Sequence, residues 1–160
     1  MNSWMIPGFN IAVYKAGLAS TQEDYETNAR IGFETLDRLE MTLADHQRLY
    51  LLETPNPTEV DIKLYTTIER FDVIYQQHFK LMTRSIRHGY PRLGRWLKSI
   101  YWNVAGVKET TNFEHIKENY SKSHIDINPK SIIPLGPEPD VGPWTAADEA
   151  WYMQETAGLK

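Results

Sequence analysis

The side chains that most often carry catalysis are unevenly represented in this sequence. Cysteine is absent from its 160 residues, which excludes a thiol nucleophile, a thiolate zinc site and a disulfide scaffold within this chain. The five histidines include no pair at the i, i+4 spacing that places two imidazoles on one helical face. They are His46, His78, His88, His115 and His124. We therefore interpret them as structural or surface residues and expect no metal site. Glycine-rich phosphate loops and serine nucleophile elbows are also missing from the sequence.

Aromatic residues are plentiful, with nine tyrosines, five tryptophans and five phenylalanines. A tyrosine in a cleft offers a flat apolar ring and a phenol that can donate a hydrogen bond to an anionic or carbonyl oxygen. Tyr14 falls in a segment that we expect to be irregular, and Tyr120 ends a short predicted helix. Spacing alone favours packing of each ring with its hydroxyl at the surface, and it leaves a binding role open.

The charged residues give a net charge of -4, with 17 Lys and Arg against 21 Asp and Glu. This balance argues against a general nucleic-acid binder. The segment from His78 to Lys98 nevertheless contains no acid and six basic residues: Lys80, Arg84, Arg87, Arg92, Arg95 and Lys98. Such a segment is either an anion site or contact surface for an acidic partner, or a solvated helical face offset by acids elsewhere. The second interpretation is the one we favour.

Helices must position these side chains, because apolar residues recur at helical rather than alternating spacing. Ser20 and Glu23 have the capping-box spacing that begins a helix. An apolar stripe follows at three- and four-residue steps, made of Tyr25, Ala29, Phe33, Leu36, Leu39 and Leu43. Thr58 and Asp61 predict the start of a second helix, which should run to about Phe71.

Two further helices are predicted after residue 90. Pro91 occupies the first turn of one of them, where its missing N–H costs nothing, and Leu93, Trp96, Leu97 and Ile100 form its apolar face. Residues 112–120 form the other. Residues 1–19 contain a proline and two glycines, and we expect an irregular lead-in there. Since no useful alternating segment occurs, the sequence predicts an all-α domain over residues 1–124.

The amino-acid composition of the sequence changes after His124. Residues 125–160 begin with five prolines in twenty residues, which predicts an extended tail. The tail is also apolar, with Ile125, Ile127, Ile132, Ile133 and Leu135, and we expect it to lie along a surface. Thr145 and Asp148 predict a short last helix. No stretch is long and apolar enough to span a membrane and no signal peptide is evident, so a cytoplasmic location is expected.

Four segments of this sequence share their order and spacing with one known family. They are residues 13–19, residues 58–61 with 70–80, residues 112–124, and residues 128–137. Together they resemble the C-terminal helical domain of the Xi-class glutathione transferases, the S-glutathionyl-hydroquinone reductases. The resemblance covers roughly residues 1–137, and it implies a glutathione transferase C-terminal-like helical bundle with an extended, proline-rich tail.

The resemblance also implies a chemistry. Family members join this domain to a thioredoxin-like domain that binds glutathione and supplies a cysteine in a Cys-Pro-Trp-Ala motif. That thiolate attacks the sulfur of a glutathionyl-hydroquinone, and a second glutathione resolves the mixed disulfide. The helical domain forms the wall of the aromatic substrate site. The positions that match the family's substrate-facing tyrosines are Tyr14 and Tyr120. The resemblance further implies a homodimer formed through the helical domain.

The sequence departs from the family in several places. Leu18 stands where phenylalanine is usual, Leu81 and Met82 replace Cys and Asn, and Ser121 replaces a second tyrosine. The thioredoxin-like half is not present in the 160 residues, so the chain alone is expected to be inactive. The alternative is a stand-alone, non-catalytic binding or dimerisation module; a degraded transferase that acts as an assembly scaffold is a further possibility. We expect a homodimer or a larger species in solution, in which the apolar tail lies on the surface that the missing domain would cover or on the second copy.

Overall fold

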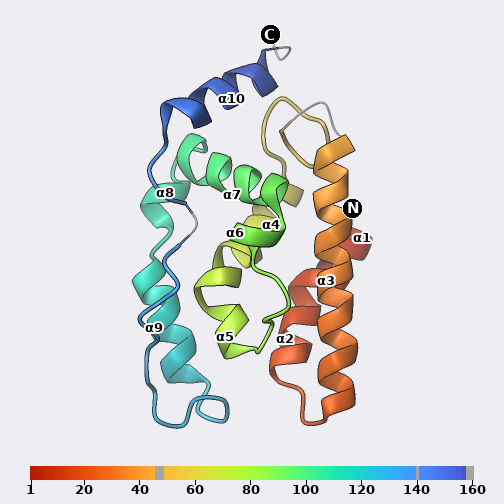
Figure 1. Ribbon diagram of the computed structural model, residues 1–160, viewed down its shortest axis with the longest axis vertical. Helices are drawn as coiled ribbons and strands as arrows, with labels where there is room; N and C mark the ends of the chain where they lie inside the picture. Colours follow the sequence, from red (N-terminus) through yellow and green to blue (C-terminus); the bar gives the residue numbers. More distant parts are fainter. Residues whose placement is uncertain (46–48, 140, 158–160) are drawn as a thin grey trace.

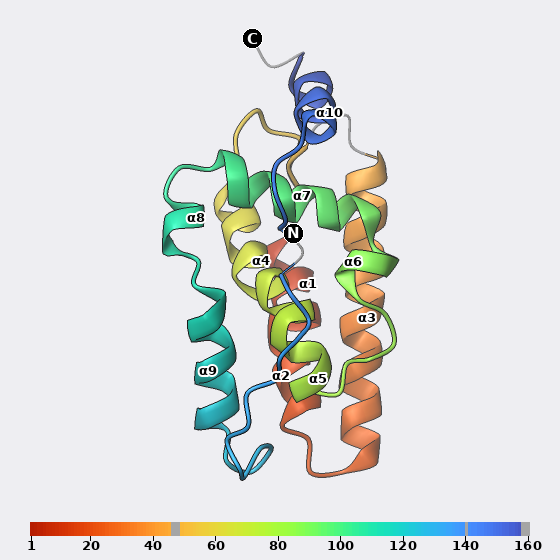
Figure 2. The same ribbon diagram turned by 60° about the vertical axis from the view of Figure 1, so that its left-hand side comes forward.

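The computed structural model describes residues 1–45, 49–139 and 141–157, and every regular element within these ranges is helical. The elements are α1 (Asn2–Met5), the π-helical η1 (Ile6–Ile11), α2 (Ala12–Gly17), α3 (Gln22–Asp45), α4 (Glu59–Arg70), the π-helical η2 (Phe71–Tyr75), α5 (Gln76–His78), α6 (Ile86–Gly89), α7 (Pro91–Asn103), α8 (Val107–Thr110), α9 (Phe113–Ser123) and α10 (Ala146–Thr156). Figures 1 and 2 show them as an elongated bundle with α3 on one side and α9 on the other. The all-α prediction is confirmed.

The N-terminal segment is helical, and the prediction of an irregular lead-in was wrong. Met5, Phe9, Val13 and Ala16 recur at three- and four-residue steps, and all four are buried in the core. Pro7 lies in the first turn of η1, which directly follows α1. Gly8 lets the helix approach α3 closely, because a Cβ atom at this position would lie only 2.4 Å from Thr35 Oγ1. Burial against α3 therefore outweighs the two local helix breakers.

The long helix α3 begins one residue later than its predicted capping box implies. The Thr21 hydroxyl, rather than that of Ser20, accepts the backbone N–H of Asp24 at 3.1 Å and donates to the Asp24 carboxylate at 2.7 Å. The predicted apolar stripe is confirmed. Leu36, Leu39 and Leu43 are buried, while Tyr25, Ala29 and Phe33 are half-buried against the same core.

The helix that starts at Thr58 has the predicted capping box but runs further than predicted. Asp61 accepts the Thr58 backbone N–H at 2.8 Å. Its other oxygen accepts the backbone N–H of Leu51 and the indole N–H of Trp96, each at 3.0 Å. The helical path continues beyond Arg70 through η2 and α5 to His78. This continuous helix lies at the centre of the bundle (Figure 1).

The predicted helices after residue 90 are confirmed. Pro91 opens α7, and the predicted face of Leu93, Trp96, Leu97 and Ile100 is buried. Asn112 caps α9 by accepting the backbone N–H of His115 at 2.9 Å. Thr145 and Asp148 cap α10, whose Asp148 carboxylate pairs with Lys98 of α7 at 2.6 Å.

The segment between α9 and α10 is extended and returns along the length of the bundle (Figures 1 and 2). Its backbone is held by side chains of the bundle: Arg87 donates to Glu138 O at 2.7 Å, and the Trp102 indole N–H donates to Val141 O at 2.9 Å. Val141 is buried in the core and Ile127 packs against it, whereas Ile132 and Leu135 face outward, and the side chain of Leu135 is 97% exposed. The tail thus lies on the bundle through its backbone and two of its apolar side chains, and it leaves other apolar side chains uncovered.

Candidate functional site: a cluster of tyrosine hydroxyls

Three tyrosines from three different elements bring their hydroxyl groups together. Tyr14 lies on α2, Tyr75 on η2 and Tyr120 on α9. The Tyr75 Oη lies 3.1 Å from that of Tyr14 and 2.9 Å from that of Tyr120, and the hydroxyls of Tyr14 and Tyr120 are also in contact. Each pair of hydroxyls is therefore within hydrogen-bonding distance. The structure brings together the two predicted site residues and adds Tyr75, to which the sequence analysis assigned no role.

A close approach between α2 and α5 makes this cluster possible. A Cβ atom on Gly17 would lie 2.0 Å from the Phe79 ring, so only glycine fits at this position. The Phe79 ring in turn stacks on Tyr75, with centroids 5.0 Å apart, and lies 5.3 Å from the Tyr14 ring. Gly17 and Phe79 thus set the distance between the helices that carry Tyr14 and Tyr75.

The hydrogen-bonding capacity of the cluster determines how it can bind a ligand. Three phenols carry three protons, and the three contacts between them can use all of these protons when each hydroxyl donates to the next. An incoming oxygen atom must therefore open one contact to receive a hydrogen bond. Tyr14 is the most exposed of the three, and it borders an open cavity of about 530 Å³ between α2 and the start of α3. Ile11 and Leu18 supply apolar walls to the same cavity.

Burial keeps two of these phenols protonated. It raises the pKa of Tyr75 far above its ordinary value, and hydrogen bonds from Tyr120 and Tyr14 act in the same direction. Burial also raises the pKa of Tyr120 to about 12. Both groups are therefore neutral hydrogen-bond donors near pH 7. Such donors suit an oxygen that gains negative charge during a reaction.

Next to the tyrosines, two histidines form a second contact between α5 and the end of α9. His78 Nε2 lies 3.0 Å from His124 Nδ1. His78 follows Tyr75 by three residues and His124 follows Tyr120 by four, so the two pairs form successive links between α5 and the end of α9. This spacing is the signal in the sequence that could have identified Tyr75. His88 and His115 lie elsewhere, and His46 lies outside the described residues.

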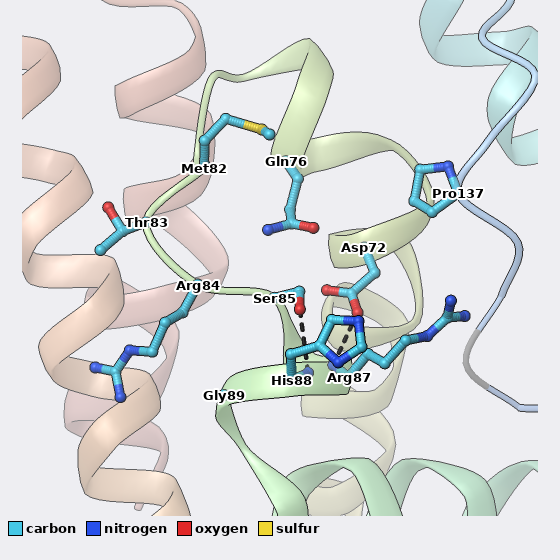
Figure 3. Close-up of a pocket in the computed structure, with 10 residues that line it drawn as sticks. All are labelled: Asp72, Gln76, Met82, Thr83, Arg84, Ser85, Arg87, His88, Gly89 and Pro137. Carbon is cyan, nitrogen blue, oxygen red and sulfur yellow. Dashed lines mark hydrogen bonds between the residues drawn. The ribbon is translucent and has the colours of Figure 1, made fainter.

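Metal and anion sites find little support in this arrangement. Across residues 1–45, 49–139 and 141–157, no group of three or more potential metal-ligating side chains occurs. The basic segment lines a cavity of about 400 Å³ (Figure 3), but Arg84 and Arg87 point away from its centre in opposite directions. Arg84 pairs with Asp37 at 2.6 Å and Arg87 donates to the tail backbone, so these charges already have partners. For Arg84 the partner is an acid of α3, and for Arg87 it is a backbone oxygen of the tail.

The cavity in Figure 3 is organised by a carboxylate rather than by an anion-binding group. Asp72 accepts the backbone N–H groups of Ile86 at 2.7 Å and Arg87 at 2.9 Å, and so caps the short helix α6. A negative side chain in this position repels an incoming anion.

None of the helices in the described residues combines the length and the apolar composition that a membrane-spanning helix needs.

Comparison with known proteins shows that this chain is similar to glutathione transferases. Residues 22–99 match the model of the glutathione S-transferase C-terminal domain. The chain is 48% identical over 141 residues to glutathione S-transferase omega-like 2 of Schizosaccharomyces pombe, covering 88% of this chain and 45% of that protein. It is 43% identical over 150 residues to the glutathionyl-hydroquinone reductase YqjG of Escherichia coli, covering 93% of this chain and 42% of that protein. The chain thus spans less than half the length of these relatives.

Solved structures give the same result for the fold. The glutathione S-transferase Xi from Phanerochaete chrysosporium superimposes with a TM-score of 0.83 at 48% identity, covering 89% of this chain and 44% of that one. The glutathione-bound structure of YqjG superimposes with a TM-score of 0.81 at 42% identity, covering 89% of this chain and 45% of that one. The resemblance seen in the sequence is therefore confirmed along most of the chain.

Proposed function

This chain belongs to the C-terminal helical domains of the Xi-class glutathione transferases, and from this premise we propose that it forms the substrate-site half of a glutathione-dependent S-glutathionyl-hydroquinone reductase. The proposal has two parts. The helical chain binds the aromatic portion of the substrate, and a thioredoxin-like domain binds glutathione and supplies the reactive thiol. We place this thiol chemistry in a reducing, cytoplasmic compartment.

The main support for this proposal is that the hydroxyls of Tyr14, Tyr75 and Tyr120 lie within hydrogen-bonding distance of one another. In the proposed reaction, a thiolate attacks the sulfur of the substrate and an S–S bond forms while the C–S bond to the ring breaks. Before this step a proton moves from the neighbouring ring hydroxyl to the carbon that bears sulfur, which gives the keto tautomer. The electron pair of the C–S bond then passes through the ring to the carbonyl oxygen, which becomes the phenolate of the free hydroquinone. Neutral phenols that donate to such an oxygen stabilise the transition state, and removal of one such donor typically lowers kcat by about 10²–10³-fold.

The absence of cysteine determines what the chain can do alone. Thiol attack needs a thiolate, and none of the 160 residues can supply one. We therefore propose that the isolated chain binds the aromatic substrate without turning it over. The substrate enters from the open cavity beside Tyr14, where Ile11 and Leu18 contact the ring.

The test compares the chain alone with the same chain joined to a cysteine-bearing thioredoxin-like domain. Both are assayed with an S-glutathionyl-hydroquinone and glutathione, and binding of the free hydroquinone to the chain alone is followed by ¹H–¹⁵N correlation spectra. We expect saturable shifts of amides near Tyr14 and Tyr120, no turnover by the chain alone, and turnover by the joined protein. Turnover by the chain alone contradicts the proposed need for an external thiol. Absence of both binding and turnover in the joined protein contradicts the substrate assignment.

A further inference from the structure

A second cavity, separate from the one beside Tyr14, lies between α4 and the segment that joins α8 to α9. Its volume is about 310 Å³, at the lower end of the range of about 300–1,000 Å³ that small-molecule sites occupy. Ile62 and Ile116 supply apolar walls, and Glu69 and Arg70 lie side by side in its lining. Nothing in the proposed reductase reaction uses this cavity.

Glu69, in the lining of this cavity, has a buried carboxylate oxygen without a hydrogen-bond partner in the described part of the chain. Its side chain is only 5% exposed, and its Oε1 contacts Arg70 Nη1. The other oxygen, Oε2, is buried and has no hydrogen-bond partner among the described residues. The nearby hydroxyls of Tyr65 and Thr111 hydrogen-bond to each other at 2.9 Å. Burial raises the pKa of Glu69, while Arg70, Tyr65 and Thr111 act in the opposite direction. A buried acceptor without a close partner is destabilising, so a donor on a ligand would stabilise this oxygen.

Arg70 offers the complementary group beside it. Its Nη1 donates to both Glu69 Oε1 and the backbone oxygen of Thr66. The remaining N–H groups, on Nε and Nη2, have no partner in the part of the chain that the structure describes, and the side chain is 26% exposed. An acceptor and a charged donor therefore occupy neighbouring positions in the lining of one cavity.

We propose that this cavity binds an α-amino carboxylate head group, with the ammonium on Glu69 Oε2 and the carboxylate on the free N–H groups of Arg70. A simple cation would leave a net positive charge beside Arg70, and a simple anion would lie against the Glu69 carboxylate. A zwitterion with adjacent charges satisfies both groups and adds no net charge to a half-buried site. Its aliphatic part would contact Ile62 and Ile116. This head group occurs in free amino acids and at the γ-glutamyl end of glutathione.

Binding can be tested on the chain itself, without any activity assay. L-alanine and glutathione are titrated into the ¹⁵N-labelled chain, and the amide resonances of Thr110, Thr111 and Asn112 are followed. Matched probes each lack one charge: L-alaninamide lacks the carboxylate, and lactate lacks the ammonium. We expect saturable shifts with a zwitterion and at least about tenfold weaker binding of both matched probes. Binding of alanine without glutathione, or the reverse, identifies the source of the head group and supports the proposal in either case.

Variants provide the second arm of the test. Glu69→Gln and Arg70→Gln should each abolish saturation by the zwitterion, because each removes one charge of the pair. Glu59→Gln is the matched control, since Glu59 lies on the same helix in an exposed pair with Lys63 and should leave binding unchanged. Dispersed amide spectra establish that each variant is folded. Equal binding of alanine, alaninamide and lactate, wild-type binding by a folded Glu69→Gln variant, or no saturable shift with either zwitterion would overturn the proposal.

Discussion

His78 Nε2 lies 3.0 Å from His124 Nδ1, and the two imidazole rings stack with their centroids 5.1 Å apart. One ring must donate and the other accept, so at least one imidazole of the pair is neutral. His78 ends α5 one turn after Tyr75, and His124 follows α9 one turn after Tyr120. The histidine contact therefore ties together the two helix ends that carry the buried tyrosines.

This contact predicts a loss of stability in mild acid. Burial lowers the pKa of His78 from 6.5 to about 4, and the charges of His124 and Lys80 act in the same direction. The unfolded chain therefore binds more protons than the folded protein between pH 4 and 6.5, so the free energy of unfolding falls as the pH falls through this window. The difference corresponds to about 3 kcal/mol, present in full above pH 6.5.

Urea unfolding between pH 4 and 7.5 measures this effect. His78→Gln keeps a hydrogen-bonding side chain that does not titrate, and it should flatten the slope of stability against pH. His115→Gln removes an exposed histidine and should retain the wild-type slope. The same slope in His78→Gln and wild type would show that His78 is not the group responsible.

Gly17→Ala should destabilise the fold and disturb the tyrosine cluster. The added Cβ would lie 2.0 Å from the Phe79 ring, which must then shift and alter its stacking on Tyr75. Overpacking of this kind costs about 1–3 kcal/mol. Gly32→Ala is the matched control, because no atom lies within 4 Å of its Cβ position and alanine favours a helix interior by about 0.5–1 kcal/mol. Thermal unfolding should lower the Tm of the first variant and raise that of the second.

Asp61→Asn should be among the most destabilising polar substitutions in this chain. The buried carboxylate accepts hydrogen bonds from the backbone of Leu51 and Thr58 and from the Trp96 indole. An amide group replaces one acceptor by a donor and faces donors already in place, which should cost about 3 kcal/mol. Asp24→Asn changes the corresponding residue of an exposed cap and should cost less than about 1 kcal/mol. Equal losses in denaturant unfolding would contradict the role assigned to burial.

The sequence predicts those helices whose signals are local. The local signals are the capping box at Thr58, the proline in the first turn at Pro91, the helical spacing in residues 112–120 and the stripe from Tyr25 to Leu43. The structure has helices in all four places. The N-terminal helices were missed because Pro7 and Gly8 are local breakers. Their helical conformation is stabilised by packing against α3, and the helical spacing of Met5, Phe9, Val13 and Ala16 was the signal that these two residues obscured.

The site was predictable only in part for the same reason. Tyr14 and Tyr120 were selected by family resemblance, and the contact between their hydroxyls depends on how α2 and α9 meet. Tyr75 is buried on a helix that was expected to end near Phe71, and the sequence analysis assigned this residue no role. Similarly, Glu69 looks like an ordinary helical charge until the structure shows it buried beside α9.

The exposed tail predicts self-association. Ile132 and Leu135 project from a backbone that is itself held by the bundle, and Leu135 is 97% exposed. Burying this strip between two copies would remove apolar surface from water. Light scattering at micromolar concentration should give a dimer, twice 18.6 kDa, and the double variant Ile132→Asp with Leu135→Asp should give a monomer. Met41→Asp, at an isolated exposed position on α3, should remain dimeric. A wild-type mass of one chain would refute this prediction.

Tyr120→Phe should separate catalysis from stability in a protein that joins this chain to a thiol-bearing domain. The substitution removes the hydroxyl that contacts both Tyr14 and Tyr75, while the contact between those two at 3.1 Å remains. Loss of one hydrogen bond costs about 1 kcal/mol of stability, whereas loss of a donor to a developing oxyanion lowers kcat by about 10²-fold. Tyr101→Phe removes a hydroxyl from a half-buried ring that packs on Phe113, and it should leave kcat unchanged. Rates measured at saturating substrate, together with the Tm of each variant, distinguish a donor to the substrate from a hydroxyl that only supports packing. If kcat falls only as far as the loss of folded protein explains, Tyr120 is a structural residue.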